Sequence, residues 1–122
     1  MSRRTERENI MKILYSLEIG GEFNKEEYSD FVVKQVYNVI ENIDEIDEII
    51  SRNLNNWTID RLNYMDKAII RYATYEMMST DIPYEILINE AIEITKTYTD
   101  IDGAQKSFNN KLLDKIRKDV RK

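Results

Sequence analysis

The chain has 122 residues with no cysteine and no histidine, which excludes disulfides, thiolate nucleophiles, zinc-thiolate sites and the side chain most used for acid-base catalysis near neutral pH. Hydrophobic residues make up 42% of it, a composition typical of one folded domain rather than a disordered segment. A net charge of −5 generally argues against nucleic-acid binding. The distribution of charge along the chain, however, matters more than its sum.

The first part of the chain predicts two helices, because its apolar residues recur at helical spacing. The first helix should begin near Ser2 or Arg3 and stop before Gly20, where two adjacent glycines remove helix propensity. The second should run from Lys25 to Asn42, with valines on one side.

The middle of the chain predicts two more helices. Asp44 is expected to cap a short third helix that ends at Asn55, and Thr58 or Asp60 to cap a fourth. The fourth helix carries two adjoining apolar stripes, so we expect it at the centre of the fold. These stripes are formed by Leu62, Met65, Ile69 and Tyr72, and by Ile70, Ala73 and Met77.

Two helices complete the prediction. Pro83 marks the start of a fifth helix that ends near Tyr98, since proline suits the first turn of a helix. A loop over residues 99–103 then leads into a sixth helix. No sustained period-two pattern and no linker interrupts the chain. We therefore predict an all-α fold, a compact bundle of about six to seven helices that forms a single domain over residues 1–122.

Basic residues gather at both ends of the chain. The first twelve residues carry four basic and two acidic side chains, and the last twelve carry six basic and two acidic ones, so the long segment between them is strongly acidic. If helix packing brings the two ends together, they form one basic platform on an acidic body, suited to a polyanion. The alternative is that the charged ends simply extend into solvent.

Several short motifs occur in an order and spacing that resemble the NusB family of bacterial transcription antitermination factors. The match extends from Ser2 to about Ile116. Its motifs are Arg3-Arg4-x-x-Arg7-Glu8, Leu14-Tyr15, Asn56-Trp57-x-x-x-Arg61-Leu62, Met65-Asp66-Lys67-Ala68-Ile69-Ile70-Arg71, Tyr75-Glu76, Asp81-Ile82-Pro83, Ile88-Asn89-Glu90-Ala91 and Phe108-x-Asn110-x-x-Leu113-Asp114-Lys115.

The resemblance implies a NusB-like helical fold that binds single-stranded RNA. It further implies a heterodimer with NusE, a ribosomal protein of the small subunit, recognition of the box A sequence of nascent ribosomal RNA, and a place in the antitermination complex of RNA polymerase. No catalytic set, Walker loop, dinucleotide fingerprint or zinc spacing is present in the sequence. We therefore expect no enzyme activity, no metal and no cofactor.

The resemblance also points to RNA-binding residues. Arg3, Arg4 and Arg7 match the arginine-rich start of the family, and guanidinium groups both pair with phosphate and stack on bases. Tyr15 and Phe108 match aromatic positions at the RNA surface, although either ring fits a helical core equally well. The same surface should include Asn110 and Lys111.

This chain departs from the family pattern beside Phe108. Asn109 and Lys111 stand where the family usually has a small apolar residue and a glycine. The departure puts in doubt how closely the backbone approaches RNA here, while Lys111 adds a positive charge to the same face.

Four polar residues match the family closely without forming a catalytic set: Arg71, Glu76, Asn89 and Glu90. A buried arginine surrounded by carboxylates and an amide is a network that can fix how two helices pack. We therefore predict a structural polar network from these four residues.

The NusE contact is expected on the central helix and its acidic neighbours, with anchors at Trp57, Arg61, Tyr64 and Tyr75. Two other functions stay open: a helical adaptor that binds protein alone, and the NusB-like domain of an RNA methyltransferase. No apolar run is long enough to span a bilayer, so we expect a cytoplasmic protein without membrane contact. The free protein is either a monomer or a homodimer.

Overall fold

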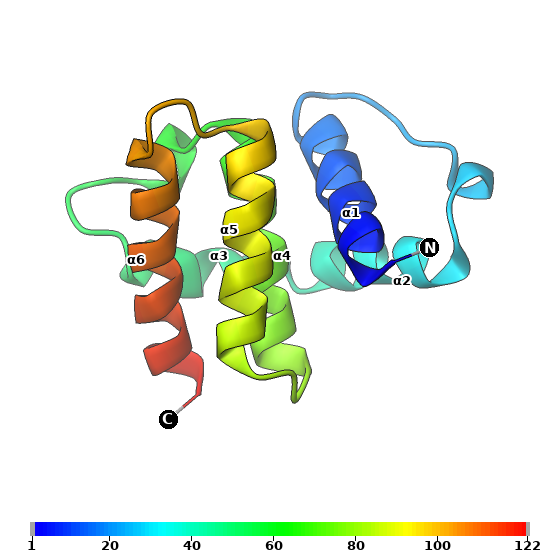
Figure 1. Ribbon diagram of the computed structural model, residues 1–122. Coiled ribbons are helices and arrows are strands. Elements are labelled where there is room, and N and C mark those ends of the chain that lie inside the picture. The colour runs from blue at the N-terminus through cyan, green and yellow to red at the C-terminus, as the bar shows by residue number, and fades with distance from the viewer. Residues whose placement is uncertain (1, 122) are drawn as a thin grey trace.

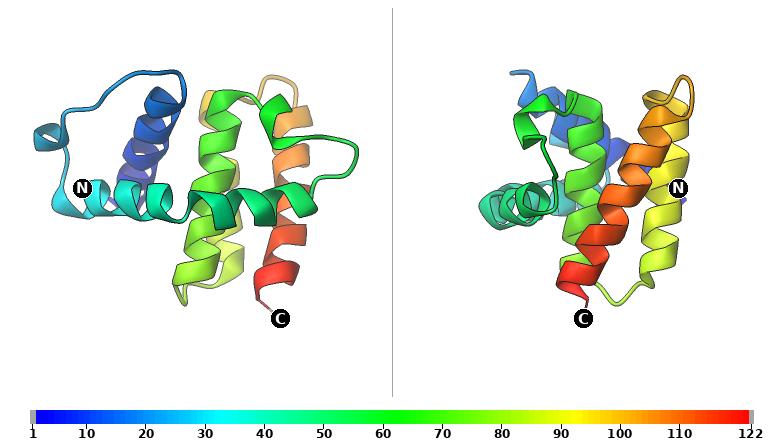
Figure 2. Two further views of the ribbon diagram at one scale, coloured as in Figure 1. Left: turned by 180° about the vertical axis from the view of Figure 1, so that it is seen from behind. Right: turned by 90° about the vertical axis from the view of Figure 1, so that its left-hand side faces the viewer.

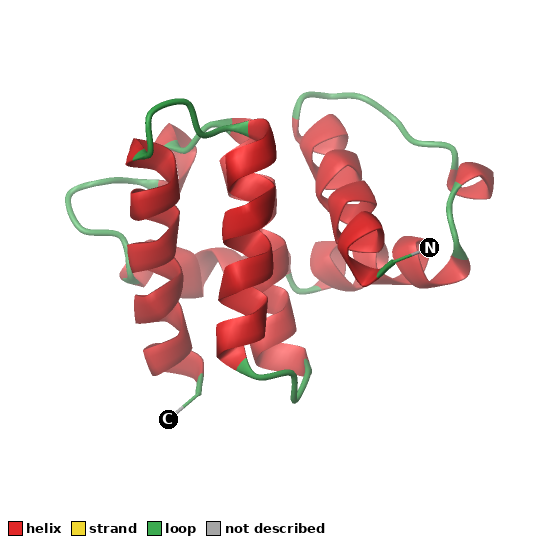
Figure 3. Cartoon of the chain, in the orientation of Figure 1, coloured by secondary structure: helices red, strands yellow, loops and turns green. Residues whose placement is uncertain are grey.

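The computed structural model describes residues 2–121, and in this range the chain forms six α-helices and no strand (Figures 1 and 3). The all-α prediction is confirmed. The helices are α1 Arg3–Glu18, α2 Asp30–Glu41, α3 Ile43–Arg52, α4 Tyr64–Ser79, α5 Tyr84–Tyr98 and α6 Ala104–Val120. Two 3₁₀ turns, Lys25–Glu27 and Ile59–Arg61, precede α2 and α4.

The helix α4 lies at the centre of the molecule, as its two apolar stripes predict. It packs against α1, α3, α5 and α6, and Ile69, Ile70 and Tyr72 on it are fully buried. The nearly collinear pair α2 and α3 runs across α1 and α4 (Figure 2). A fully buried isoleucine contributes about 1.5–3 kcal/mol relative to an exposed one, so these contacts largely hold the bundle together.

The basic ends of the chain do not meet, and the expected single platform is wrong. α1 packs on α2 and α4, whereas α6 packs on α4 and α5, and α5 lies between α1 and α6 (Figure 1). The exposed side of α5 includes Glu85, and Glu90 and Glu93 on the same helix are partly exposed. Acidic side chains therefore separate the basic start of α1 from the basic residues of α6.

Helix caps explain most differences from the predicted boundaries. α1 begins at Arg3, within the predicted start, and Ser2 caps it, since its hydroxyl accepts from the Thr5 amide at 3.1 Å. The cap of α4 is Asn63, whose side chain accepts from the Asp66 amide at 2.8 Å, while Thr58 precedes only the 3₁₀ turn. Asp44 lies in the first turn of α3 rather than at its cap.

The predicted second helix is divided in two. Ser29 has extended backbone geometry, and its hydroxyl accepts from the Val32 amide, so α2 begins at Asp30. The preceding residues form the 3₁₀ turn, which is capped by Asn24. Serine and asparagine side chains compete for backbone amides in this way, and this competition shortens a helix that periodicity alone extends.

Among residues 2–121, no helix has the length and apolar character required to cross a membrane.

Candidate nucleic-acid interface

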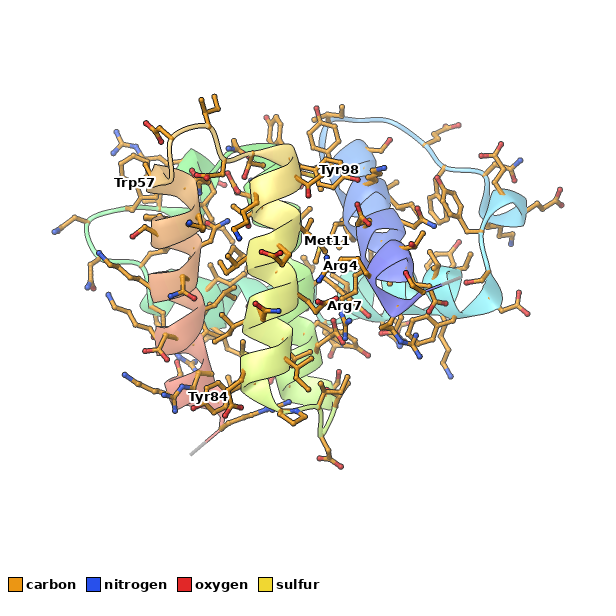
Figure 4. The ribbon with its side chains drawn as sticks, in the orientation of Figure 1. Arg4, Arg7, Met11, Trp57, Tyr84 and Tyr98 are labelled. Atoms are coloured by element: carbon orange, nitrogen blue, oxygen red, sulfur yellow. The ribbon has the colours of Figure 1, made fainter. Side chains whose placement is uncertain are left out.

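Two adjoining hollows lie at one end of the molecule, where α1 and α5 finish and α4 and α6 start. The first, of about 390 Å³, is lined by Tyr15, Asn63, Tyr64, Met65, Tyr98 and Thr99. The second, of about 300 Å³, is lined by Trp57, Arg61, Leu62, Asn63, Gln105 and Phe108. Asn63 borders both hollows. Figure 4 shows Trp57 and Tyr98 at this same end.

Aromatic side chains dominate this end, and we call Tyr15, Trp57, Tyr64, Tyr98 and Phe108 together the aromatic surface. Their exposed fractions range from 36% for Phe108 to 48% for Tyr64. Among the described residues only one other aromatic, Tyr37 on α2, is as exposed. Tyr15 and Phe108 therefore lie at the surface rather than in the core. Rings that stay accessible in this number can stack on unpaired bases or anchor a protein partner.

Cationic groups border the aromatic surface. The guanidinium carbon of Arg61 lies 5.2 Å from the centre of the Trp57 ring, and the Lys12 ammonium lies 5.1 Å from that of Tyr98. A hydrogen bond with the Tyr98 hydroxyl raises the pKa of Lys12. Both cations are exposed, so this end of the molecule combines rings with positive charge, the combination that single-stranded nucleic acid requires.

A line of lysines leads away from the aromatic surface along α6. Lys111, Lys115 and Lys118 are exposed and follow Phe108 at helical spacing, so they share its side of the helix. Lys118 pairs with Asp114 at 3.1 Å, whereas Lys111 and Lys115 form no ion pair within the described chain. Asn110 is exposed beside them, so the three α6 residues predicted for RNA contact, Phe108, Asn110 and Lys111, are all accessible.

A buried polar network supports the aromatic surface from beneath. Asn109 is fully buried, and its amide nitrogen donates to Asp66 Oδ1 and Thr95 Oγ1, both at 3.0 Å. The Thr99 hydroxyl donates to the same Asp66 oxygen at 2.8 Å, and Gln105 Nε2 donates to Asn109 Oδ1 at 2.9 Å. The network joins the first turn of α4 to the last turns of α5 and the start of α6.

Sequence reasoning missed this network, although one signal was present. Asn109 departs from the family pattern at a position next to the apolar stripe of α6, and a polar residue there requires a partner. The carboxylate of Asp66, 0% exposed, is that partner. Asn109 thus stabilises the fold, and α6 keeps its position through side chains from three helices.

The prediction of an RNA contact at Arg7 is wrong. Arg7 is 5% exposed, and its guanidinium donates to both oxygens of Glu76 at 2.7 and 3.0 Å, with Glu90 3.6 Å away (Figure 4). The apolar stripe of α1 faces α4, and Arg7 lies on the same side, so it points at a carboxylate of the core rather than at solvent. Its role is to join α1 to α4.

Arg3 and Arg4 keep part of their surface exposed. Arg4 donates to both carboxylate oxygens of Glu90, and this hydrogen bonding lowers the pKa of Glu90. Arg3 lies over the Phe31 ring, 4.0 Å from its centre, and pairs with Glu6 at 3.0 Å. Neither lines the hollows of the aromatic surface, and a phosphate has to compete with these carboxylates for both.

The predicted network of Arg71, Glu76, Asn89 and Glu90 does not form as one unit. Arg71 binds Asp47 at 2.7 and 2.8 Å and Glu18 at 3.2 Å, away from Glu76. Lys67 also donates to Glu18, at 2.8 Å, and these cations lower the pKa of Glu18, Lys67 most strongly.

The other three members of that prediction have different surroundings. Glu76 pairs instead with Arg7, and Glu90 with Arg4, both on α1. Asn89 is exposed on α5. Each of the three charged residues forms ion pairs with another helix, but not the predicted pairs, and Asn89 lies outside them.

The four predicted partner anchors do not share one surface either. Trp57, Arg61 and Tyr64 border the two hollows, but Tyr75 is half-buried and stacks on Tyr72 with ring centres 6.1 Å apart. Tyr64 and Tyr75 are about 16 Å apart along the axis of α4. Within the described residues, no group of three or more acidic side chains is arranged to hold a metal ion.

Comparisons with known proteins all point in one direction. Residues 4–118 match the model of the NusB family. Transcription antitermination protein NusB from Bacillus cereus (strain B4264) is 38% identical over 129 aligned positions, which cover 96% of this chain and 98% of that protein. The protein of the same name from Bacillus anthracis (strain CDC 684 / NRRL 3495) gives the same identity and coverage.

Solved structures agree with these matches. The structure of T. maritima NusB superposes with a TM-score of 0.87 at 32% identity, over 100% of this chain and 94% of that one. A crystal structure of the antitermination factors NusB and NusE in complex with dsRNA gives a TM-score of 0.80 at 22% identity, over 96% of both chains, and shows likeness of fold alone.

Proposed function

The chain belongs to the NusB family, and from this premise we propose that it is a non-enzymatic transcription antitermination factor that binds RNA together with NusE. The similarity of fold to a NusB seen with NusE and RNA supports this proposal. We further propose that the RNA is the box A sequence of nascent ribosomal RNA transcripts, read as a single strand, and that the pair joins the antitermination complex of RNA polymerase.

The observation that carries the RNA part is the aromatic surface with the lysines beside it. Stacking on exposed rings contributes about 1–3 kcal/mol per base, and lysines that neutralise phosphates contribute affinity that depends on salt. Tyr15 and Phe108 supply rings, Asn110 an amide, and Lys111 and Lys115 charge. A double helix hides its base faces, so this surface suits an unpaired strand.

Arg3 and Arg4 form a second and weaker contact in this proposal. They are separated from the α6 lysines by α5, so only a strand that crosses α5 reaches both. Each must also leave a carboxylate to bind phosphate. A longer RNA should therefore use them, and a short one should not.

The proposed contact with NusE lies around Tyr64, next to the proposed RNA surface. Tyr64 is 48% exposed, and the Lys67 ammonium lies 5.3 Å from the centre of its ring and binds Glu18. Glu18, the acidic group close by, suits a basic ribosomal protein. Trp57 and Arg61, predicted as partner anchors, share a hollow with Phe108, so we assign them to RNA.

An RNA-binding titration tests the proposal. The purified chain, alone and with NusE, is mixed with fluorescent box A RNA and with a scrambled strand of equal length. We expect weak binding alone, tighter binding with NusE, a preference for box A, and an affinity that falls steeply with salt. Binding of NusE without any RNA affinity at low salt would instead support an adaptor that binds protein alone.

A further inference from the structure

We propose that the hollow between Trp57 and Phe108 is a receptor for one unpaired base of the bound RNA, with Arg61 holding the phosphate of that nucleotide. The inference rests on the proposed function and assigns one subsite within it. The hollow brings together segments far apart in sequence, because Trp57 follows α3 and Phe108 lies in the second turn of α6.

The shape and lining of the hollow suit a flat, partly polar ligand. Its volume of about 300 Å³ is at the lower end of the range for small-molecule pockets. Trp57, 44% exposed, and Phe108, 36% exposed, line the hollow from two separate chain segments, and Leu62 adds apolar surface. An aromatic base gains by stacking on such rings whatever its identity.

Among the arginines of residues 2–121, Arg61 has the least internal use. Among the described residues every other arginine binds a carboxylate or a backbone carbonyl, as Arg4 binds Glu90 and Arg121 binds the carbonyls of Met77 and Thr80. Within residues 2–121 Arg61 binds neither, and its guanidinium lies over the Trp57 ring. An exposed guanidinium beside a ring can bind phosphate without breaking an ion pair.

The buried network beneath the hollow fixes which end of the Gln105 amide is presented. Asp66 is an acceptor, so Asn109 must turn its NH₂ toward it, and Asn109 Oδ1 then accepts from Gln105 Nε2 at 2.9 Å. Gln105 therefore keeps its Oε1 for a ligand. A carbonyl oxygen at the wall of the hollow accepts from an amino or imino group at the edge of a base.

The rest of the strand has a route away from the hollow. Lys111 and Lys115 follow Phe108 on the same side of α6 and form no ion pair within the described chain. A strand with one base in the hollow and its backbone along α6 places phosphates beside both lysines. Stacking and charge pairing then act on the same ligand.

The chain contains a single tryptophan, so its fluorescence reports on this hollow directly. Single-stranded box A RNA is titrated into the protein, and fluorescence is compared with binding measured by mobility shift. We expect quenching that saturates at the same RNA concentration as binding. A set of RNAs, each with one abasic position, should contain one member that binds roughly 5- to 100-fold more weakly and no longer quenches.

Variants separate stacking from general damage. Trp57→Ala should weaken binding of intact RNA by a similar factor. In this variant the critical abasic position should cause no further loss of affinity, because both changes remove the same contact. Trp57→Phe should restore most of the affinity. Tyr37→Ala, a matched change at an exposed ring on α2, should leave RNA binding unaltered.

Three results would overturn the inference. RNA binding at full affinity by Trp57→Ala, with no fluorescence change in the unaltered protein, removes the base receptor but leaves the proposed function intact. Quenching by NusE alone, together with weaker NusE binding by Trp57→Ala, assigns the hollow to protein. Absence of RNA binding by the unaltered protein with NusE present removes both the receptor and the proposed function.

Discussion

Arg7 at the start of α1 and Arg61 beside Trp57 differ in whether their guanidinium groups are available to a ligand. Arg7 is buried against Glu76 and Glu90, whereas Arg61 is exposed, lies over the Trp57 ring and forms no ion pair with any described residue. The arginine-rich start of α1 is the more basic-looking motif in the sequence, yet its charges are largely used within the molecule. Charge along a sequence therefore predicts where cations are, but carboxylates from other helices decide which of them a ligand can reach.

The largest effect expected from this comparison is on stability. Arg7→Ala leaves Glu76 buried without its partner and should lower the free energy of unfolding by about 3–5 kcal/mol, measured by urea denaturation. Arg61→Ala removes no ion pair with any of residues 2–121 and should change the free energy of unfolding by less than about 0.5 kcal/mol. If both variants were equally stable, Arg7 would have no structural role.

A smaller loss of stability is expected from the network under the aromatic surface. Asn109→Ala removes two hydrogen bonds to buried groups and leaves Asp66 with fewer donors, which should cost about 1–3 kcal/mol. The midpoint of urea unfolding measures it. Asn110→Ala, one residue along on the exposed side of α6, is the matched control and should be close to neutral.

The fold was largely predictable from sequence, because apolar spacing of 3.6 residues reflects burial on one side of a helix. The central place of α4 follows from this spacing, while Gly20 and Pro83 indicate where α1 ends and α5 begins. The break at Ser29 and the cap at Asn63 were not predictable from this spacing. Several residues in each segment can accept a hydrogen bond from a backbone amide, and local competition decides among them.

The candidate site was predictable only in part. Tyr15, Phe108, Asn110 and Lys111 are accessible as the RNA assignment requires. The burial of Arg7 was not predictable, because its partner Glu76 lies 69 positions away and only packing brings them together. For the same reason no local pattern indicates that Trp57 and Phe108 line one hollow.

The ion pair of Arg4 with Glu90 should appear as a modest dependence of stability on pH. Because the pKa of Glu90 is lowered in the folded protein, the unfolded chain binds the proton more readily, and stability rises with pH in that range. The contribution is complete above the unfolded value of about 4.3 and is lost as the pH falls through the folded value.

Glu90→Gln isolates this contribution. Between about pH 5 and pH 3 the variant should lose less stability than the unaltered protein, as measured by thermal unfolding across that range. Glu93→Gln, on the same helix face, provides the comparison, since Glu93 pairs with Lys96 in its own helix and is more exposed. If the curves of thermal stability against pH for the unaltered protein and Glu90→Gln were parallel, the ion pair between Arg4 and Glu90 would contribute nothing to stability.

The most direct measurement compares RNA affinity after neutralising each region in turn. A short box A RNA is titrated, with NusE present, into Lys111→Gln/Lys115→Gln and into Arg3→Gln/Arg4→Gln across a range of salt. We predict that the lysine pair weakens binding several-fold more and lowers the salt slope by about 0.7 for each phosphate that no longer has a cation beside it, while the arginine pair leaves the slope nearly unchanged. The reverse order, with the larger effect at Arg3 and Arg4, would contradict the placement of RNA on α6 and the aromatic surface.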